Sequence, residues 1–159
     1  NDVLRSGSIA EQALHQEKRL RIDKLAAEVV DDYMLLAKTR GMTFVVNTEP
    51  TTIRANRDMM HHVISNLVSN AVRHGDRGSV IKITCDQHEL AIENACKPLT
   101  KQQLQHVFDP FYRTSDATKQ HADSSGIGLY TVKMLLDAKG LDYKFVSHGQ
   151  GMRFVVRFG

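Results

Sequence analysis

A stripe of polar side chains follows one side of the predicted helix over residues 58–74. Because helical residues are about 100° apart, five of them fall within roughly a third of a turn of one another: His62, Asn66, Asn70, Arg73 and His74. Asparagine is a poor helix former, but its amide offers a neutral carbonyl oxygen and an N–H donor. Mg²⁺ takes oxygen ligands and often shares its shell with substrate phosphates. The stripe suits a metal–phosphate site; asparagines that cap or cross-link buried backbone are an equally open interpretation.

A second candidate site lies where a polar stretch gives way to a predicted helix, in the run Ser125, Gly126, Ile127, Gly128 and Leu129. Glycines at such a junction let backbone N–H groups approach a phosphate, and the helix N-terminus adds partial positive charge. A plain loop-to-helix junction is the alternative. Residues 114–125 contain no large aliphatic side chain. They are expected to form a long mobile loop of the kind that folds over a bound ligand.

Three aromatic side chains lie close together just before that polar stretch, in the run Phe108, Asp109, Pro110, Phe111, Tyr112 and Arg113. Their position predicts a hydrophobic anchor for the loop. Simple core packing is the alternative, and it is compatible with anchoring.

Helices and strands must position these residues. Apolar residues at three- and four-residue steps predict long helices from residue 23 to a stop at Gly41, over 58–74 and over 128–139, and Thr100 begins a short helix to about residue 107. Strands are predicted over 42–47, around 52–54, and in two hairpins, 80–85 with 90–94 and 141–147 with 152–158. This α+β pattern places helices on one face of a mixed sheet.

Composition narrows the class of protein. The 159 residues are 42% hydrophobic and 25% charged, as in an ordinary globular domain, which excludes a collagen-like fibre, a disulfide scaffold and disorder throughout. No apolar run approaches the ~20 residues that span a bilayer, and no signal peptide is expected. The net charge of +3 is scattered, which argues against nucleic acid as a partner. Cys85 and Cys96 form no zinc spacing, so a reduced, cytoplasmic setting is expected.

Four motifs in order carry a resemblance to a known family. They are N-L-V-S-N-A-V-R-H at 66–74, F-D-P-F-Y-R at 108–113, S-G-I-G-L at 125–129 and G-Q-G-M-R-F at 149–154. Over about residues 23–158 the chain resembles the ATP-binding catalytic domain of bacterial sensor histidine kinases. These belong to the GHKL superfamily, with type II topoisomerases, Hsp90 and mismatch-repair ATPases. The resemblance implies a two-layer α/β sandwich with about three helices on a mixed sheet of about five strands.

The resemblance also implies roles for the residues of the polar stripe. Asn70 matches the family's magnesium ligand, and Asn66 matches the asparagine that helps hold the triphosphate and the metal. Arg73 occupies the position that contacts phosphates, and His74 the position beside the nucleotide. His62 stands where related kinases carry a polar residue that assists transfer, with ordinary hydrogen bonding as the alternative.

The other motifs match the remaining parts of a nucleotide site. Gly126 and Gly128, with Ser125, Ile127 and Leu129 around them, match the glycines that flank the phosphates. Phe108 and Phe111, followed by Tyr112 and Arg113, match the phenylalanine box, and residues 109–125 match the ATP lid.

One segment departs from the family pattern. Where the family usually has D-x-G-x-G, this chain has Asn94-Ala95-Cys96-Lys97-Pro98. Asn94 still accepts a hydrogen bond from the adenine amino group through its side-chain oxygen, without the charge of aspartate. Losing one charge-assisted hydrogen bond costs on the order of 1–3 kcal/mol of affinity. Pro98 fixes its own φ near −65°, so the loop takes a path that needs no positive φ there.

The resemblance implies a division of the chain and a function. Residues 1–22 are expected to be the end of a dimerisation helix and its linker, and residues 23–159 the catalytic domain. His15 lacks the sequence context of a phosphoacceptor. The domain is then expected to bind Mg²⁺ and ATP and to donate the γ-phosphate to a histidine on a dimerisation domain outside this chain. The fragment is expected to be monomeric and cytoplasmic, and the intact protein a dimeric membrane sensor that passes phosphate to a response regulator.

Two rival interpretations remain open. A degenerate GHKL domain that has lost nucleotide binding would serve only as an interaction module, and the altered segment at 94–98 motivates that interpretation. An ATP-hydrolysing GHKL machine is the other rival. It would need a glutamate general base where this chain has His62, together with additional domains.

Overall fold

A five-stranded mixed sheet forms one layer of the molecule. The computed structural model describes residues 16–110 and 128–159. In spatial order the strands are β2 (Thr43–Thr48), β4 (Val80–Cys85), β5 (Glu89–Ala95), β7 (Gly151–Arg157) and β6 (Asp142–His148). Only β2 and β4 run parallel; each other neighbouring pair is antiparallel. The hairpins β4–β5 and β6–β7 are the two that the sequence predicts.

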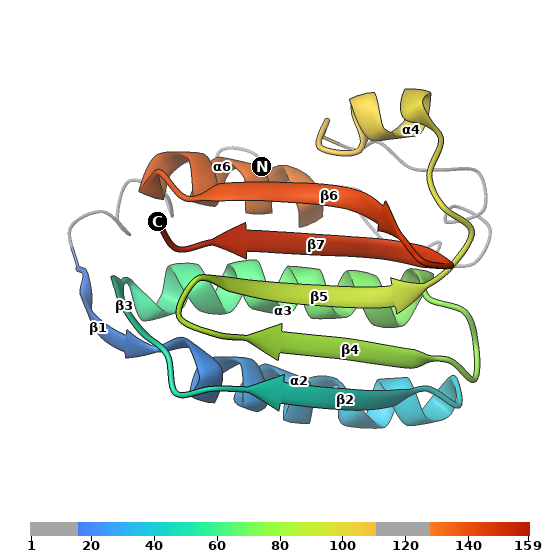
Figure 1. Cartoon of the computed structure of the whole chain (residues 1–159), viewed down its shortest axis with the longest axis horizontal. Coiled ribbons are helices and arrows are strands. Elements are labelled where there is room, and N and C mark those ends of the chain that lie inside the picture. The colour runs from blue at the N-terminus through green and yellow to red at the C-terminus, as the bar shows by residue number, and fades with distance from the viewer. Residues whose placement is uncertain (1–15, 111–127) are drawn as a thin grey trace.

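Three long helices cover one face of this sheet: α2 (Ile22–Thr39), α3 (Arg57–His74) and α6 (Gly128–Lys139) (Figure 1). The short α4 (Lys101–His106) lies at the β6 edge. The predicted α+β sandwich is therefore confirmed, with four helices in the described part of the chain.

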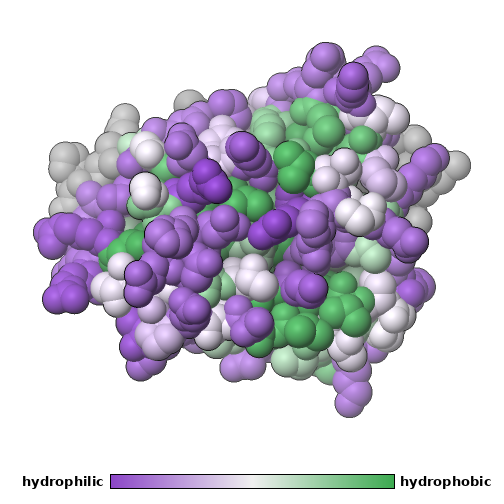
Figure 2. All heavy atoms as spheres, in the orientation of Figure 1, coloured by the Kyte–Doolittle hydropathy of each residue, from purple (hydrophilic) through white to green (hydrophobic). Residues whose placement is uncertain are grey.

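The core fills the space between the two layers. Apolar side chains of α3 that recur at helical spacing are fully buried against the sheet, among them Met60, Val63, Ile64 and Val68. Alternate residues of the strands, such as Ile81 and Ile83 on β4, supply the opposite side of the core. The other face of the sheet is mostly hydrophilic (Figure 2). Ion pairs lie on that face, including Arg153 with Glu89, 3.2 Å apart.

Local signals mark several helix boundaries. The Asn56 side chain caps α3 by accepting a hydrogen bond of 2.9 Å from the Met59 N–H. Thr100 and Gln103 form a reciprocal capping box at the start of α4. Gly41 follows the end of α2 and has a left-handed backbone, with φ of +67°. Glycine suits this position because it adopts that conformation at little cost in free energy.

One strand was not predicted from the sequence. β1 (Lys18–Arg21) pairs antiparallel with β3 (Thr52–Ala55), and Leu20 lies opposite Ile53. Its sequence of three basic residues and one leucine resembles a solvated connector, so no periodicity marks it. Residues 1–15 lie outside the described residues, and their assignment to a dimerisation helix stays a prediction.

Candidate functional site

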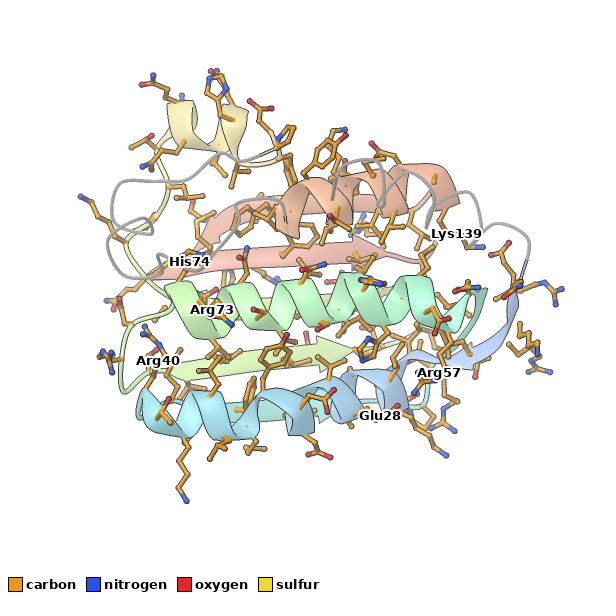
Figure 3. The ribbon with its side chains drawn as sticks, turned by 180° about the vertical axis from the view of Figure 1, so that it is seen from behind. Glu28, Arg40, Arg57, Arg73, His74 and Lys139 are labelled. Carbon is orange, nitrogen blue, oxygen red and sulfur yellow. The ribbon has the colours of Figure 1, made fainter. Side chains whose placement is uncertain are left out.

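The polar stripe of α3 lies along the border of the buried core. The apolar residues beside it are buried, whereas Asn66, Asn70, Arg73 and His74 are half-buried and His62 is exposed. Arg73 and His74 lie at the C-terminal end of α3 (Figure 3). Helix α3 therefore buries its apolar stripe and presents amide and cationic groups on one side, as the sequence predicts.

Asn66 meets the beginning of α6. Its side-chain Nδ2 donates a hydrogen bond of 2.9 Å to the backbone oxygen of His62, one turn earlier. Its Oδ1 lies 3.3 Å from the position that a Cβ on Gly128 would occupy. A side chain at residue 128 would press against this amide, so glycine permits the close approach of α6 to α3. The structure thus joins one asparagine of the stripe to the second glycine of the predicted phosphate-binding run.

Arg73 is tethered to its own helix. Its Nε donates a hydrogen bond of 3.1 Å to the hydroxyl of Ser69. Because Ser69 lies one turn earlier, this bond limits the directions that the guanidinium can take. Arg73 is thereby held on α3 near its last turn, where a cation is also favoured by the helix dipole.

Asn94 lies where β5 meets the turn after α3. The Asp76 N–H donates a hydrogen bond of 2.8 Å to the Ala95 oxygen. A Cβ on the buried Gly75 would lie 3.5 Å from the Cβ of Asn94. The Asn94 amide is half-buried, and its Nδ2 lies 3.5 Å from the Ala95 oxygen, longer than an ordinary hydrogen bond. The end of α3 and the residue predicted to contact adenine are therefore adjacent.

The altered segment after Asn94 remains attached to the sheet. The Cys96 N–H donates a hydrogen bond of 3.1 Å to the Gln150 oxygen in the β6–β7 turn. A Cβ on Gly151 would lie only 1.9 Å from the Asn94 oxygen, so only glycine fits there. Burial raises the pKa of the Cys96 thiol above its usual range.

Phe108 belongs to an aromatic cluster at the β6 edge of the sheet. Its ring packs edge-on against Tyr143 and Phe154, at centroid distances of 5.6 and 6.1 Å. Tyr143 and Phe154 in turn stack at 6.0 Å. Phe108 therefore packs against the core, as one of the two compatible interpretations of the sequence requires.

Several predicted site residues lie outside the described residues: Phe111, Tyr112, Arg113, Ser125, Gly126 and Ile127. The same holds for the predicted mobile loop over 114–125. Leu129, in the first turn of α6, is described and packs against the core. The roles of all these residues in nucleotide binding stay predictions.

The side-chain amides of the polar stripe suit a magnesium ion that is bound together with a phosphate ligand. Within residues 16–110 and 128–159, no group of three or more His, Cys, Asp or Glu side chains is placed to hold a metal. The stripe instead offers the half-buried amides of Asn66 and Asn70. Because Mg²⁺ keeps several waters and is commonly held by one or two protein oxygens plus phosphates, amide oxygens beside a cation fit that chemistry.

One residue near this site was missed in the sequence. Arg40 follows α2, and its Nη2 donates a hydrogen bond of 2.8 Å to the Gly75 oxygen, directly after α3. A lone arginine before a helix-stopping glycine gives no signal beyond favourable charge at a helix end. Its partner lies 35 residues away in the sequence, and only the folded chain brings the two together.

Comparison with known proteins identifies the family. Residues 55–159 match the family described as histidine kinase-, DNA gyrase B- and HSP90-like ATPase. The chain is 31% identical over 156 residues to the sensor histidine protein kinase HK06 of Streptococcus pneumoniae strain D39, an alignment covering 98% of this chain and 35% of that protein. It is 29% identical over 149 residues to the sensor histidine kinase CusS of Escherichia coli K12, covering 91% of this chain and 31% of that protein.

A solved structure agrees on the fold. The catalytic domain of histidine kinase ThkA superposes with a TM-score of 0.79 at 22% identity, covering 90% of this chain and 95% of that one. The chain spans about a third of the length of the curated relatives it matches. Among the described residues, no helix has both the length and the apolar character needed to cross a membrane. The chain belongs to the histidine kinase-, DNA gyrase B- and HSP90-like ATPase family, and within it to the catalytic domains of the histidine kinases.

Proposed function

We propose that this domain binds Mg-ATP and presents the γ-phosphate to a histidine on a separate dimerisation domain. The observation that carries the proposal is the meeting of Asn66 on α3 with Gly128 at the start of α6. It joins an amide oxygen to a helix N-terminus, where backbone N–H groups and the helix dipole favour a phosphate. Two segments far apart in sequence thus lie side by side, and both offer groups that suit a phosphate.

Four residues of the stripe, all but His62, have a role in this proposal, and so does Asn94. Asn70 ligates Mg²⁺, with Asn66 supporting the metal and the triphosphate. Arg73 neutralises phosphate charge, and His74 lies beside the nucleotide. Asn94 accepts a hydrogen bond from the adenine amino group. Phosphoryl transfer depends mainly on positioning and charge neutralisation, so no residue of this domain acts as the nucleophile.

The resemblance also supports a proposal for the intact protein. We infer a dimeric membrane sensor whose catalytic domain lies in the cytoplasm. It transfers phosphate from ATP to its own histidine and from there to an aspartate of a response regulator. Nucleic acid is not among the proposed partners.

Calorimetric titration with ATP, with and without Mg²⁺, tests the proposal. Saturable binding that the metal strengthens is the expected result. Asn70→Ala is expected to remove most of the gain that Mg²⁺ gives, because it deletes the proposed ligand, while metal-free binding changes little. Ser65→Ala is a matched control on α3: its hydroxyl lies 3.1 Å from the hydroxyl of Tyr33 on α2, so it belongs to the helix–helix contact.

Two results would contradict the proposal. A folded wild-type domain that gives no heat at near-millimolar ATP would support the interaction-module interpretation instead. An Asn70→Ala variant with an unchanged response to Mg²⁺ would remove Asn70 from the metal site, even if ATP binds.

A further inference from the structure

Arg40 joins the ends of two helices. It follows α2, and its guanidinium Nη2 donates a hydrogen bond of 2.8 Å to the Gly75 oxygen, directly after α3. The backbone makes a second connection, because the Gly78 N–H donates a hydrogen bond of 3.0 Å to the Arg40 oxygen. Arg40, Arg73 and His74 lie at the same end of the α2–α3 pair (Figure 3). Arg40 thus holds the residue next to His74 by its side chain and the following turn by its backbone.

The turn that Arg40 holds also contacts β5. The Asp76 N–H donates to the Ala95 oxygen at 2.8 Å, and a Cβ on Gly75 would meet the Met42 side chain at 2.7 Å. Gly75 is buried with an extended φ of −71°, so its small size rather than a left-handed backbone explains the glycine. The end of α2, the end of α3 and the end of β5 therefore meet at one tightly packed junction.

Arg40 occupies this junction at an energetic cost. Its Nε is buried and makes no hydrogen bond within the described part of the chain. Burial, and secondarily the charge of the neighbouring Arg77, lower the pKa of Arg40. The arginine is also unnecessary for ending α2, because Gly41 with its left-handed backbone already does so. Arg40 is therefore costly to bury and is not needed to end α2. These two observations point to a role for Arg40 in holding the end of α3.

We propose that Arg40 is a positioning residue for the nucleotide site. By holding the Gly75 oxygen, its guanidinium fixes the last turn of α3 against β5, so that Arg73 and His74 keep their place relative to Asn94. Arg40 itself does not touch the ligand. This inference rests on the proposed function, because the positioned residues are those assigned to Mg-ATP.

The test compares three variants of the domain by two measurements. Arg40→Met removes the bond and the charge, whereas Arg40→Lys keeps the charge and one reachable donor. Arg57→Met is the matched control, since Arg57 lies near the other end of the same pair of helices, where it bonds Glu28 on α2 (Figure 3). Amide hydrogen exchange is measured at Gly75 and Asp76, and Mg-ATP affinity by calorimetry well below each melting temperature.

Arg40→Met is expected to speed exchange at Gly75 and Asp76 relative to the middle of α3, and to weaken Mg-ATP binding by about tenfold, the scale of one lost charged hydrogen bond. Arg40→Lys should recover part of both effects, and Arg57→Met should show neither. Unchanged exchange in Arg40→Met overturns the positioning role whatever the affinities show. Faster exchange with wild-type affinity overturns the link to the nucleotide. If the wild-type domain does not bind Mg-ATP, both the proposed function and the link between Arg40 and the nucleotide are wrong. The titration of the wild-type domain identifies this outcome before any variant is compared.

Discussion

Replacing Gly151 by alanine should disrupt the junction between β5 and β7. The added Cβ would lie 1.9 Å from the Asn94 oxygen, and real contacts of this kind essentially never fall below 3.0 Å. The two strands must therefore separate locally by about 1.1 Å, the difference between those distances. The obstacle is backbone rather than the end of a flexible side chain, so no rotamer change relieves it.

The expected loss of stability in Gly151→Ala follows from the contacts that this separation would disturb. Overpacking of this kind costs about 1–3 kcal/mol. The same separation would weaken the neighbouring hydrogen bond from the Cys96 N–H to the Gln150 oxygen. A hydrogen bond of this kind contributes about 1 kcal/mol to the free energy of unfolding. We expect Gly151→Ala to lose about 3 kcal/mol of unfolding free energy or more, a large part of the stability of an ordinary domain.

Urea denaturation of Gly151→Ala and Gly149→Ala provides the measurement and its control. Gly149 lies two residues earlier, in the turn before β7, with φ of +58° and open space where a Cβ would stand. Alanine there meets only backbone strain, about 1–2 kcal/mol. If Gly151→Ala were no less stable than Gly149→Ala, the close approach of β7 to the Asn94 oxygen would be wrong, and so would the position of Asn94 beside that strand.

Two further predictions concern single polar groups. The Arg21 guanidinium, with help from the Thr51 N–H, holds the pKa of Asp23 well below its usual range, through bonds of 2.7, 2.8 and 2.9 Å. Because the folded-state pKa is depressed, this stabilisation is fully present above the unfolded pKa of about 4, and it is lost progressively as the pH falls from there through the lower folded-state pKa. Asp23→Asn should therefore lose about 1–2 kcal/mol at pH 7 and little at low pH; urea midpoints that fall equally at both pH values would contradict this. Asn94→Asp should tighten Mg-ATP binding by about tenfold, since it turns a neutral acceptor into a charged one; calorimetry showing no gain would remove Asn94 from adenine recognition.

Elements with a strong local signal were predictable from the sequence. Helix α6 runs from Gly128 to Lys139 as the pattern predicts, and Gly140, with φ of +80°, follows it. The hairpins were predictable for a similar reason, because strand periodicity and polar turns lie within a few residues of each other. The polar stripe of α3 was equally visible, since every member lies on one helix.

Features that depend on distant partners were not predictable in this way. Strand β1 forms by pairing with β3, where Leu20 lies opposite Ile53. The residues around Leu20 carry no strand pattern that would predict this pairing. The connection from Arg40 to Gly75 has the same character. The motif order indicated the family, but the contacts that hold the motifs together are long-range.

The backbone contacts around Asn94 show why the altered segment after it is compatible with the fold. Close backbone approach is required at Gly151, on the strand opposite Asn94. Cys96 needs only a backbone N–H for its bond to Gln150, which any residue but proline supplies. Pro98 is exposed and lies beyond the end of β5, where no ladder bond requires its missing N–H. The position that must be glycine is therefore glycine in this chain, and the departures at residues 96 and 98 fall where the backbone tolerates a side chain.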